Sequence, residues 1–284
     1  MCEFCHKHGE GKKWYLRAEN YSEDLLSDLR RRKFIEEFVG NQEYFRKGLQ
    51  GLERLQRVPS YIRAVINPIL LKRQKRRHWG QVVPIEEIER IFGFVSSVVR
   101  LPCLCRQTTT GKEQRYCYAL SMVPFDESKL IGIVRDLDPA YLTGPHTSGL
   151  EKLSKNEALT SLKELEKKGL CHTIWTFLSP FIGAICNCDR SDCIAMRASL
   201  RLDYPMMFPA DYVVEINPNL CKGCRMCMHV CQFGAMGYSI ANNKVVIEQS
   251  KCYGCGICRV SCPENAIMLN ESSPILPAAR ARGL

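Results

Sequence analysis

Eight cysteines near the C-terminal end of the sequence are the residues best suited to do chemistry. Their spacing, C-x2-C-x2-C-x3-C, occurs twice at an offset of 31 residues. Three thiols at two-residue intervals can hold three corners of an iron–sulfur cubane, while the fourth points toward the other motif. The spacing therefore predicts two [4Fe-4S] clusters with crossed ligation. Cluster I would be held by Cys221, Cys224, Cys227 and Cys262, and cluster II by Cys252, Cys255, Cys258 and Cys231.

This segment resembles a bacterial-type ferredoxin domain with two [4Fe-4S] clusters, over about residues 211–271. The resemblance implies a small pseudo-symmetric fold and the transfer of single electrons. Gly223 and Gly254 suit it, because a loop wrapped around a cluster needs residues that accept positive φ. Pro263 follows the second motif as in the family, whereas Gln232 occupies that place in the first. We expect this difference to alter local hydrogen bonding rather than ligation.

Zinc binding and disulfide formation are the other common roles of cysteines in such motifs. Zinc ribbons pair two C-x2-C knuckles and need no third or fourth cysteine at this spacing. Disulfide frameworks suit secreted chains, whereas this sequence starts Met-Cys-Glu-Phe-Cys-His, without the features of a signal peptide. The longest apolar run, 174–185, is too short to span a bilayer. We therefore expect a cytoplasmic protein with reduced, metal-bound thiols and no transmembrane segment.

A second group of cysteines lies in the middle of the chain, where two C-x-C pairs are each followed by a further cysteine. On an extended segment, alternating side chains put both thiols of such a pair on the same side. We expect the group to hold at least one further iron–sulfur centre. A zinc site, or thiols that pack as small apolar residues, are the alternatives. The six residues are Cys103, Cys105, Cys117, Cys186, Cys188 and Cys193.

The order Leu-Pro-Cys-x-Cys-Arg, a helix ending Gly-Leu-x-His and then Ile-Cys-Asn-Cys is similar to the N-terminal portion of ferredoxin-fused proteins of anaerobic bacteria and archaea. The similarity covers about residues 82–200. Those relatives have more cysteines after Ile-Cys-Asn-Cys than this chain, so the number of clusters here stays open. Cys2 and Cys5 could add ligands to the middle site, or bind zinc together with His8.

Local signals predict the elements that position these residues. Helices are expected over 22–39, 43–55 and 61–77, and from Pro84 onward. Ser154 and Glu157 predict a capping box for a helix that ends near Gly169 and leads into a strand over 170–175. Between the two cysteine motifs, 237–248 has the pattern of a short hairpin.

The predicted fold class is α+β. We expect a mostly helical N-terminal domain with short strands that carry the C-x-C segments, followed by the small pseudo-symmetric ferredoxin-like domain. The expected divisions are a helical region at 1–80, a mixed α/β domain with the additional iron–sulfur site at 81–210, the ferredoxin domain at 211–271 and a tail at 272–284.

Charge is distributed unevenly along the chain. The net charge is +10, residues 211–271 sum to zero, and much of the excess lies in the run Lys72–His78. Such a run could contact a phosphate backbone, but no nucleic-acid-binding fold or aromatic platform accompanies it. We expect a solvated helix end or a docking face for an acidic protein instead.

No dinucleotide fingerprint, P-loop or hydrolase signature is present in the sequence. We therefore expect an electron-transfer protein, the ferredoxin-type subunit of a cytoplasmic anaerobic oxidoreductase complex. It would relay single electrons through two [4Fe-4S] clusters and a third centre to a redox partner protein. The alternatives are a catalytic reductase that uses an unusual cluster in the 103–193 cysteine site, and an iron–sulfur regulator that binds nucleic acid.

Overall fold

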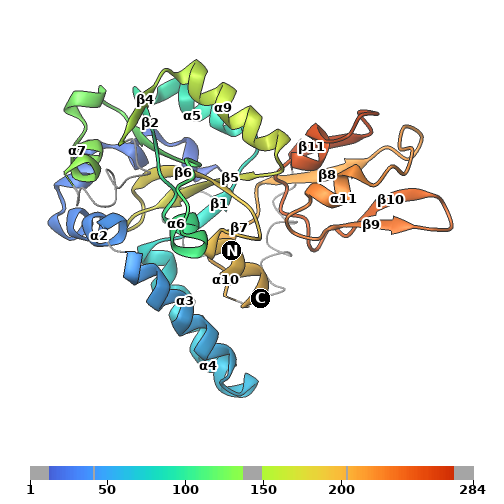
Figure 1. Cartoon of the computed structure of the whole chain (residues 1–284), viewed down its shortest axis with the longest axis horizontal. Helices are drawn as coiled ribbons and strands as arrows, with labels where there is room; N and C mark the ends of the chain where they lie inside the picture. Colours follow the sequence, from blue (N-terminus) through green and yellow to red (C-terminus); the bar gives the residue numbers. More distant parts are fainter. Residues whose placement is uncertain (1–12, 41, 137–148, 203, 272–284) are drawn as a thin grey trace.

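The computed structural model describes residues 13–40, 42–136, 149–202 and 204–271 (Figure 1). The predictions for Cys2, Cys5 and His8, and for the tail at 272–284, lie outside the described residues. No disulfide joins the cysteines within the described ranges. In this part of the chain, no helix combines the length and the apolar character needed to cross a bilayer.

A seven-stranded sheet forms the centre of the larger part of the molecule, in the order β4-β2-β3-β6-β5-β1-β7. Neighbouring strands are antiparallel, except that β1 and β7 are parallel. The expected mixture of helices and strands is confirmed, and the strands form one sheet rather than isolated pieces. The strands are β1 (Gly80–Val82), β2 (Ser97–Leu101), β3 (Cys117–Ser121), β4 (Glu151–Leu153), β5 (Cys171–Thr176), β6 (Ile182–Cys188) and β7 (Met207–Phe208).

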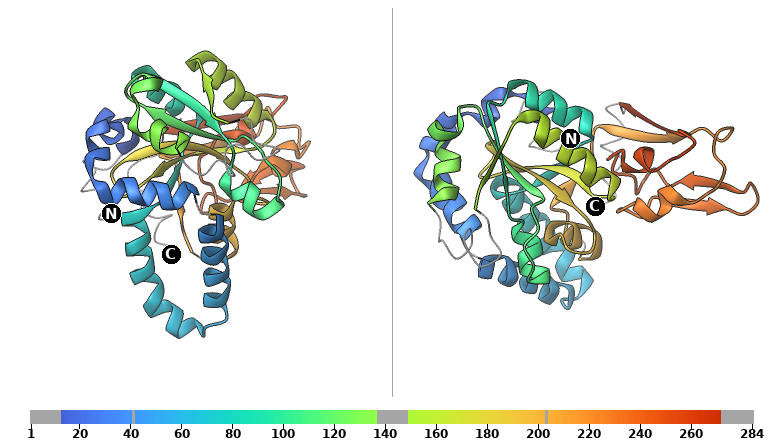
Figure 2. Two further views of the ribbon diagram at one scale, coloured as in Figure 1. Left: turned by 60° about the vertical axis from the view of Figure 1, so that its left-hand side comes forward. Right: turned by 45° about the horizontal axis from the view of Figure 1, so that its top comes forward.

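Helices cover both faces of this sheet (Figure 2). One face packs against α5 (Ile85–Phe94) and α9 (Lys155–Lys167) through a core that includes Ile88, Leu162 and Ile185. The predicted capping box of Ser154 and Glu157 at the start of α9 is confirmed. The opposite face has a second core, which also contains the thiols of Cys171, Cys188 and Cys193. Its helices are α2 (Leu29–Gly40), α6 (Leu104–Thr110), α7 (Lys129–Arg135) and α10 (Ile194–Arg201).

The N-terminal segment enters through short 3-10 turns, η1 (Trp14–Leu16), η2 (Ala18–Tyr21) and η3 (Glu23–Ser27), and η4 (Phe125–Glu127) precedes α7. The helix predicted over 22–39 is therefore wrong in its first part. Ser22 accepts a hydrogen bond from the Asp24 N–H, and Asp28 accepts one from the Arg30 N–H. Such local bonds compete with regular helix and favour turns and helix starts.

Two helices, α3 (Gln42–Gln56) and α4 (Ser60–Arg77), project away from the sheet (Figures 1 and 2). None of the residues of α4 is buried. In the basic run at its end, Lys72 and Arg73 are exposed. Lys75 lies 4.6 Å from the centre of the Phe208 ring, and Arg77 lies 5.2 Å from that of Phe34. The run is thus partly solvated and partly packed on aromatic rings.

The C-terminal segment has its own hydrophobic core, in which Val214, Ala235, Val245 and Ala266 surround cysteine side chains. Two small antiparallel sheets frame it, one of β8 with β11 and one of β9 with β10. The hairpin expected at 237–248 corresponds to the latter pair. The elements are β8 (Tyr212–Ile216), α11 (Met226–Val230), β9 (Met236–Ser239), β10 (Lys244–Ile247), α12 (Ile257–Val260) and β11 (Ile267–Glu271).

Candidate iron–sulfur sites

The eight C-terminal cysteines lie in two groups that cross between the motifs. The first tetrad, Cys221, Cys224, Cys227 and Cys262, lines one pocket. In the second tetrad, the thiols of Cys255 and Cys258 both lie close enough to Cys231 and Cys252 to interact electrostatically. The fourth cysteine of each motif therefore lies beside the first three of the other.

The loops that carry the tetrads depend on glycine at equivalent positions. Gly223 and Gly254 have φ values of 69° and 65°. A Cβ atom would lie 2.2 Å from the Asn243 carbonyl oxygen at Gly223, and 2.2 Å from the Tyr212 carbonyl oxygen at Gly254. Both the backbone conformation and the lack of space exclude a larger residue. This tight wrapping is what a cluster-binding loop requires.

Backbone amides point at the sulfur atoms in both halves. The Ala235 N–H donates to Cys231 Sγ at 3.3 Å, and the Ala266 N–H donates to Cys262 Sγ at 3.4 Å. Burial raises the pKa of the Cys227 thiol to about 11 and that of Cys255 to about 12. Such thiols ionise when they coordinate a metal, and N–H···S bonds then stabilise the negative sulfur. The donor set therefore fits [4Fe-4S] clusters.

The structure brings the six middle cysteines together from four segments of the chain. Sγ–Sγ distances are 3.4 Å between Cys117 and Cys186 and 3.2 Å between Cys188 and Cys193. The thiol of Cys103 lies beside those of Cys105 and Cys117, and the thiol of Cys105 lies beside that of Cys193. All six line one cavity of about 700 Å³. We call this group the six-cysteine site.

The two C-x-C pairs reach this site in different ways. Cys186 and Cys188 lie on the same face of β6, and Cys186 is the cross-strand partner of Cys117 on β3. The expectation of an extended segment is wrong for the other pair, because α6 begins at Leu104 and includes Cys105. Pro102 ends the strand before it, since proline has no N–H to donate to a sheet. Cys103 and Cys193 each immediately precede the first residue of a helix.

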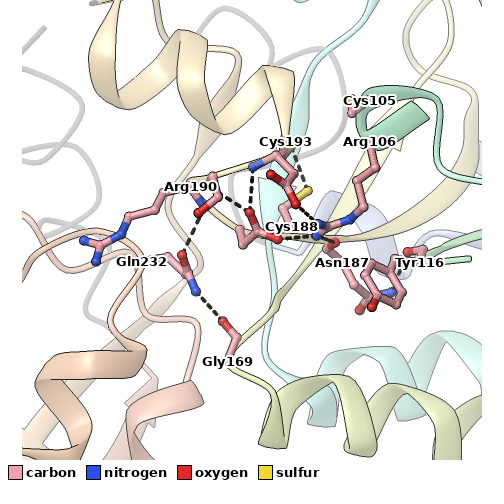
Figure 3. Close-up of polar contacts among 12 residues, drawn as sticks. Cys105, Arg106, Tyr116, Gly169, Asn187, Cys188, Arg190, Cys193 and Gln232 are labelled. Carbon is pink, nitrogen blue, oxygen red and sulfur yellow. Dashed lines mark hydrogen bonds and ion pairs between the residues drawn. The ribbon is translucent and has the colours of Figure 1, made fainter. Parts of the chain in front are cut away.

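Arg106 is a central residue of this site that sequence reasoning missed. Its side chain is 2% exposed and forms ion pairs with Asp189 and with Asp192, the latter at 3.1 Å (Figure 3). Its guanidinium lies 4.5 Å from the centre of the Tyr116 ring, and its Nε has no hydrogen-bond partner. Burial lowers the pKa of Arg106, but the pairing with Asp189 raises it overall. The site thus contains a permanent positive charge beside its thiols.

Cys171 extends the site along β5, whereas the neighbouring His172 does not. Cys171 is fully buried and faces Cys188 across the strand pair, and its thiol interacts with those of Cys255 and Cys193. The His172 side chain does not join this group of thiols. Its Nδ1 bonds to Asn187, and its Nε2 lies 3.5 Å from Glu166.

An aromatic wall faces the thiols across the cavity. His78 stacks on Trp175 with ring centres 4.8 Å apart, and Phe38 and Phe177 pack around it. Among the described residues, no three His, Cys, Asp or Glu side chains converge as the ligands of one metal ion would. Convergence of that kind characterises mononuclear sites, whereas each thiolate of a cubane binds a different iron.

Comparisons with known proteins match a minor part of the chain. Residues 220–267 match the family model of the 4Fe-4S dicluster domain. Over 64 residues, the chain is 38% identical to proteins described as archaeal-type glutamate synthase [NADPH] from Thermotoga sp. (strain RQ2) and Thermotoga maritima. This stretch is 22% of the chain and 13% of each relative. No solved structure matches the chain. The matches support an iron–sulfur domain near the C-terminus with a role in electron transfer.

Proposed function

We propose that the chain is the ferredoxin-type subunit of a cytoplasmic oxidoreductase complex of an anaerobe. The first and second tetrads would each bind one [4Fe-4S] cluster, and the six-cysteine site would hold a third centre. The observation that carries this proposal is the crossed grouping of the eight cysteines inside the 4Fe-4S dicluster match. When bound, such clusters accept and donate single electrons without changing covalent bonds.

Several features support the third centre and the division of the chain. Six thiols from separate segments surround one cavity, beside the cation of Arg106. The separate core of the C-terminal segment supports a boundary near residue 210. The regions 1–80, 81–210 and 211–271, with a tail at 272–284, remain our proposed divisions.

Iron and sulfide analysis of anaerobically purified protein, combined with EPR, tests the proposal. Three [4Fe-4S] centres predict about twelve irons per chain, and two predict about eight. Colourless protein that contains zinc would overturn the function as a whole. About eight irons would remove the third centre but leave the ferredoxin domain.

The cavity supports a second candidate, a reductase that acts on a thiol, disulfide or other small molecule. Its aromatic wall and the unpartnered Nε of Arg106 resemble the mixed apolar and polar lining of ligand pockets. Turnover of a small disulfide by the isolated chain, with a reduced viologen as electron donor, would favour this candidate. Copurification with a catalytic partner, together with no turnover by the isolated chain, would favour the ferredoxin-type subunit.

The glutamate synthases share a small part of their length with this chain, so their reaction is not transferred to it. Nucleic acid is not the partner we propose, because part of the basic run of α4 packs on Phe208 and Phe34. Salt-sensitive retention of the purified chain on nucleic acid would contradict this choice.

A further inference from the structure

Gln232, the residue after Cys231, links the C-terminal domain to the sheet domain. Its Nε2 donates to the Gly169 carbonyl at 2.6 Å, and its Oε1 accepts from the Arg190 N–H at 3.0 Å (Figure 3). Gly169 leads into β5, and Arg190 lies between Cys188 and Cys193. The equivalent residue of the second motif is Pro263, which has no side-chain amide. The link therefore belongs to one half of the pseudo-symmetric domain.

Apolar packing continues across the same boundary. Cys231 and Cys255 pack against the hydrophobic core that contains Cys171, Cys188 and Cys193. The ring of Tyr253 stacks on Phe233 with centres 4.0 Å apart, and the Tyr253 carbonyl accepts a hydrogen bond from the Ala210 N–H. We call this contact, with Gln232 and Cys171 at its centre, the seam.

The first tetrad lies away from the seam. The separate core of the C-terminal domain contains cysteines of both tetrads, but only Cys231 and Cys255, from the second tetrad, also pack against the core of the sheet domain. In the first tetrad, Cys224 is exposed. The side chains of Leu220 and Met226 beside them are 47% and 49% exposed, and Lys222 is also exposed. Glu264 is the one acidic residue that lines the same pocket, so the surface at Cys224 is apolar and, with Lys222 and Arg225, basic on balance.

We propose that the seam is the internal electron-transfer contact of this chain. The second tetrad would exchange electrons with the six-cysteine site, with Cys171 between them, and the first tetrad would exchange electrons with an external protein. Each step moves one electron, so that one site is oxidised as its neighbour is reduced and no bond forms or breaks. This order of transfer rests on the proposed function and on the packing of Cys231, Cys255 and Cys171 at the seam, because electron transfer slows steeply as sites move apart.

The surface at Cys224 fits an acidic one-electron carrier protein. Lys222 and Arg225 are both exposed there, and opposite charge on a partner would steer the encounter. Reversal of charge in Lys222→Glu should slow reduction by an acidic ferredoxin by about tenfold at low salt. The matched control is Lys251→Glu, which alters an exposed lysine near the second tetrad and should leave the rate unchanged. Equal slowing in both variants would overturn the docking assignment.

Magnetic interaction between reduced centres tests the order inside the chain. In the EPR spectrum of the fully reduced protein, magnetic interaction between the third centre and the cluster of the second tetrad should broaden the lines. Cys224→Ala should leave this line broadening, and Cys255→Ala should remove it. The opposite result, with about twelve irons in the parent protein, would overturn the order of electron transfer but leave the third centre in place. About eight irons would overturn the third centre itself and this proposal with it.

A second pair of variants keeps every ligand in place. Gln232→Ala removes the bridge across the seam, whereas Gln249→Ala removes a bond of the same 2.6 Å length to the Val214 carbonyl within the C-terminal domain. Gln232→Ala should weaken the broadening and slow electron transfer between the domains, with unchanged iron content. Gln249→Ala should change neither. Equal behaviour of the two variants would contradict a role for the seam.

Discussion

At the residue scale, the six-cysteine site combines several thiols with one buried cation. Ionised thiolates in a buried site are costly unless positive charge compensates them. Arg106 supplies such a charge, and its ion pairs with Asp189 and Asp192 fix the position of the guanidinium. The residue therefore serves both the stability of the sheet domain and the electrostatics of the site.

Replacing Arg106 with glutamine should lower the free energy of unfolding by about 3 kcal/mol, because it leaves two carboxylates without their buried partner. The control is Arg17→Gln, which removes an ion pair with Glu19 that is largely exposed, and it should cost less than about 1 kcal/mol. Anaerobic urea unfolding followed by tryptophan fluorescence measures both. If Arg106→Gln lowered the free energy of unfolding as little as Arg17→Gln, the buried ion pairs would contribute little to stability.

Crossed ligation makes a prediction for single cysteines. Cys231→Ala should damage the cluster of the second tetrad, because Cys231 lies with Cys255 and Cys258 rather than with its own motif. Cys262→Ala should instead damage the cluster of the first tetrad. EPR of each reduced variant distinguishes the two signals. Loss of the first tetrad's signal in Cys231→Ala would refute the crossed arrangement.

At the scale of elements, the cluster loops are the parts least tolerant of change. Gly254→Ala should abolish iron binding by the second tetrad, since its Cβ would overlap the Tyr212 carbonyl oxygen. Gly111→Ala is the matched control, because Gly111 also has positive φ, at 68°, but has nothing within 4 Å. The control should lose about 1 kcal/mol of stability and no iron. Full iron content in Gly254→Ala would contradict the steric argument.

At the scale of the whole molecule, we expect the sheet and the C-terminal segment to depend on metal to different degrees. The sheet domain has two large apolar cores, whereas the C-terminal core consists largely of small residues and cysteine thiols. So small a domain gains much of its folding free energy from metal binding.

Iron removal with an anaerobic chelator should therefore unfold residues 211–271 and leave the sheet folded. Hydrogen exchange with mass spectrometry measures this, with fast exchange expected in β8–β11 and continued protection in β5 and β6. Uniform protection of both domains after iron removal would be inconsistent with the expected dependence on metal.

The sheet domain should lose stability in acid because of His78. Burial lowers its pKa from 6.5 to about 3, so the folded protein binds fewer protons than the unfolded chain between these values. Stability is then complete above pH 6.5 and falls as the pH falls through this window. Between pH 7.5 and 5.5 the loss from this group is about 1.4 kcal/mol. His78→Gln should show a correspondingly smaller change in urea midpoint, and an unchanged pH dependence would refute the assignment.

Features that depend on local geometry could be predicted from the amino-acid sequence. Two cysteine motifs at a fixed spacing predict which thiols group together, because short loops leave few ways to surround a cluster. The capping box of α9 and the hairpin of β9 and β10 are also local, and the structure contains both. By contrast, the helix expected from residue 22 and the extended Cys103–Cys105 pair were wrong. Side-chain bonds to the backbone and a proline changed the local conformation there.

The meeting of distant segments of the chain could be seen only in the folded molecule. The pairing of Cys117 with Cys186, the burial of Arg106 between Asp189 and Asp192, and the bridge from Gln232 to Gly169 all join residues far apart in the chain. No periodicity or spacing encodes such contacts, because they depend on the order and register of the strands and on which face each helix covers. The six-cysteine site and the seam are products of that packing.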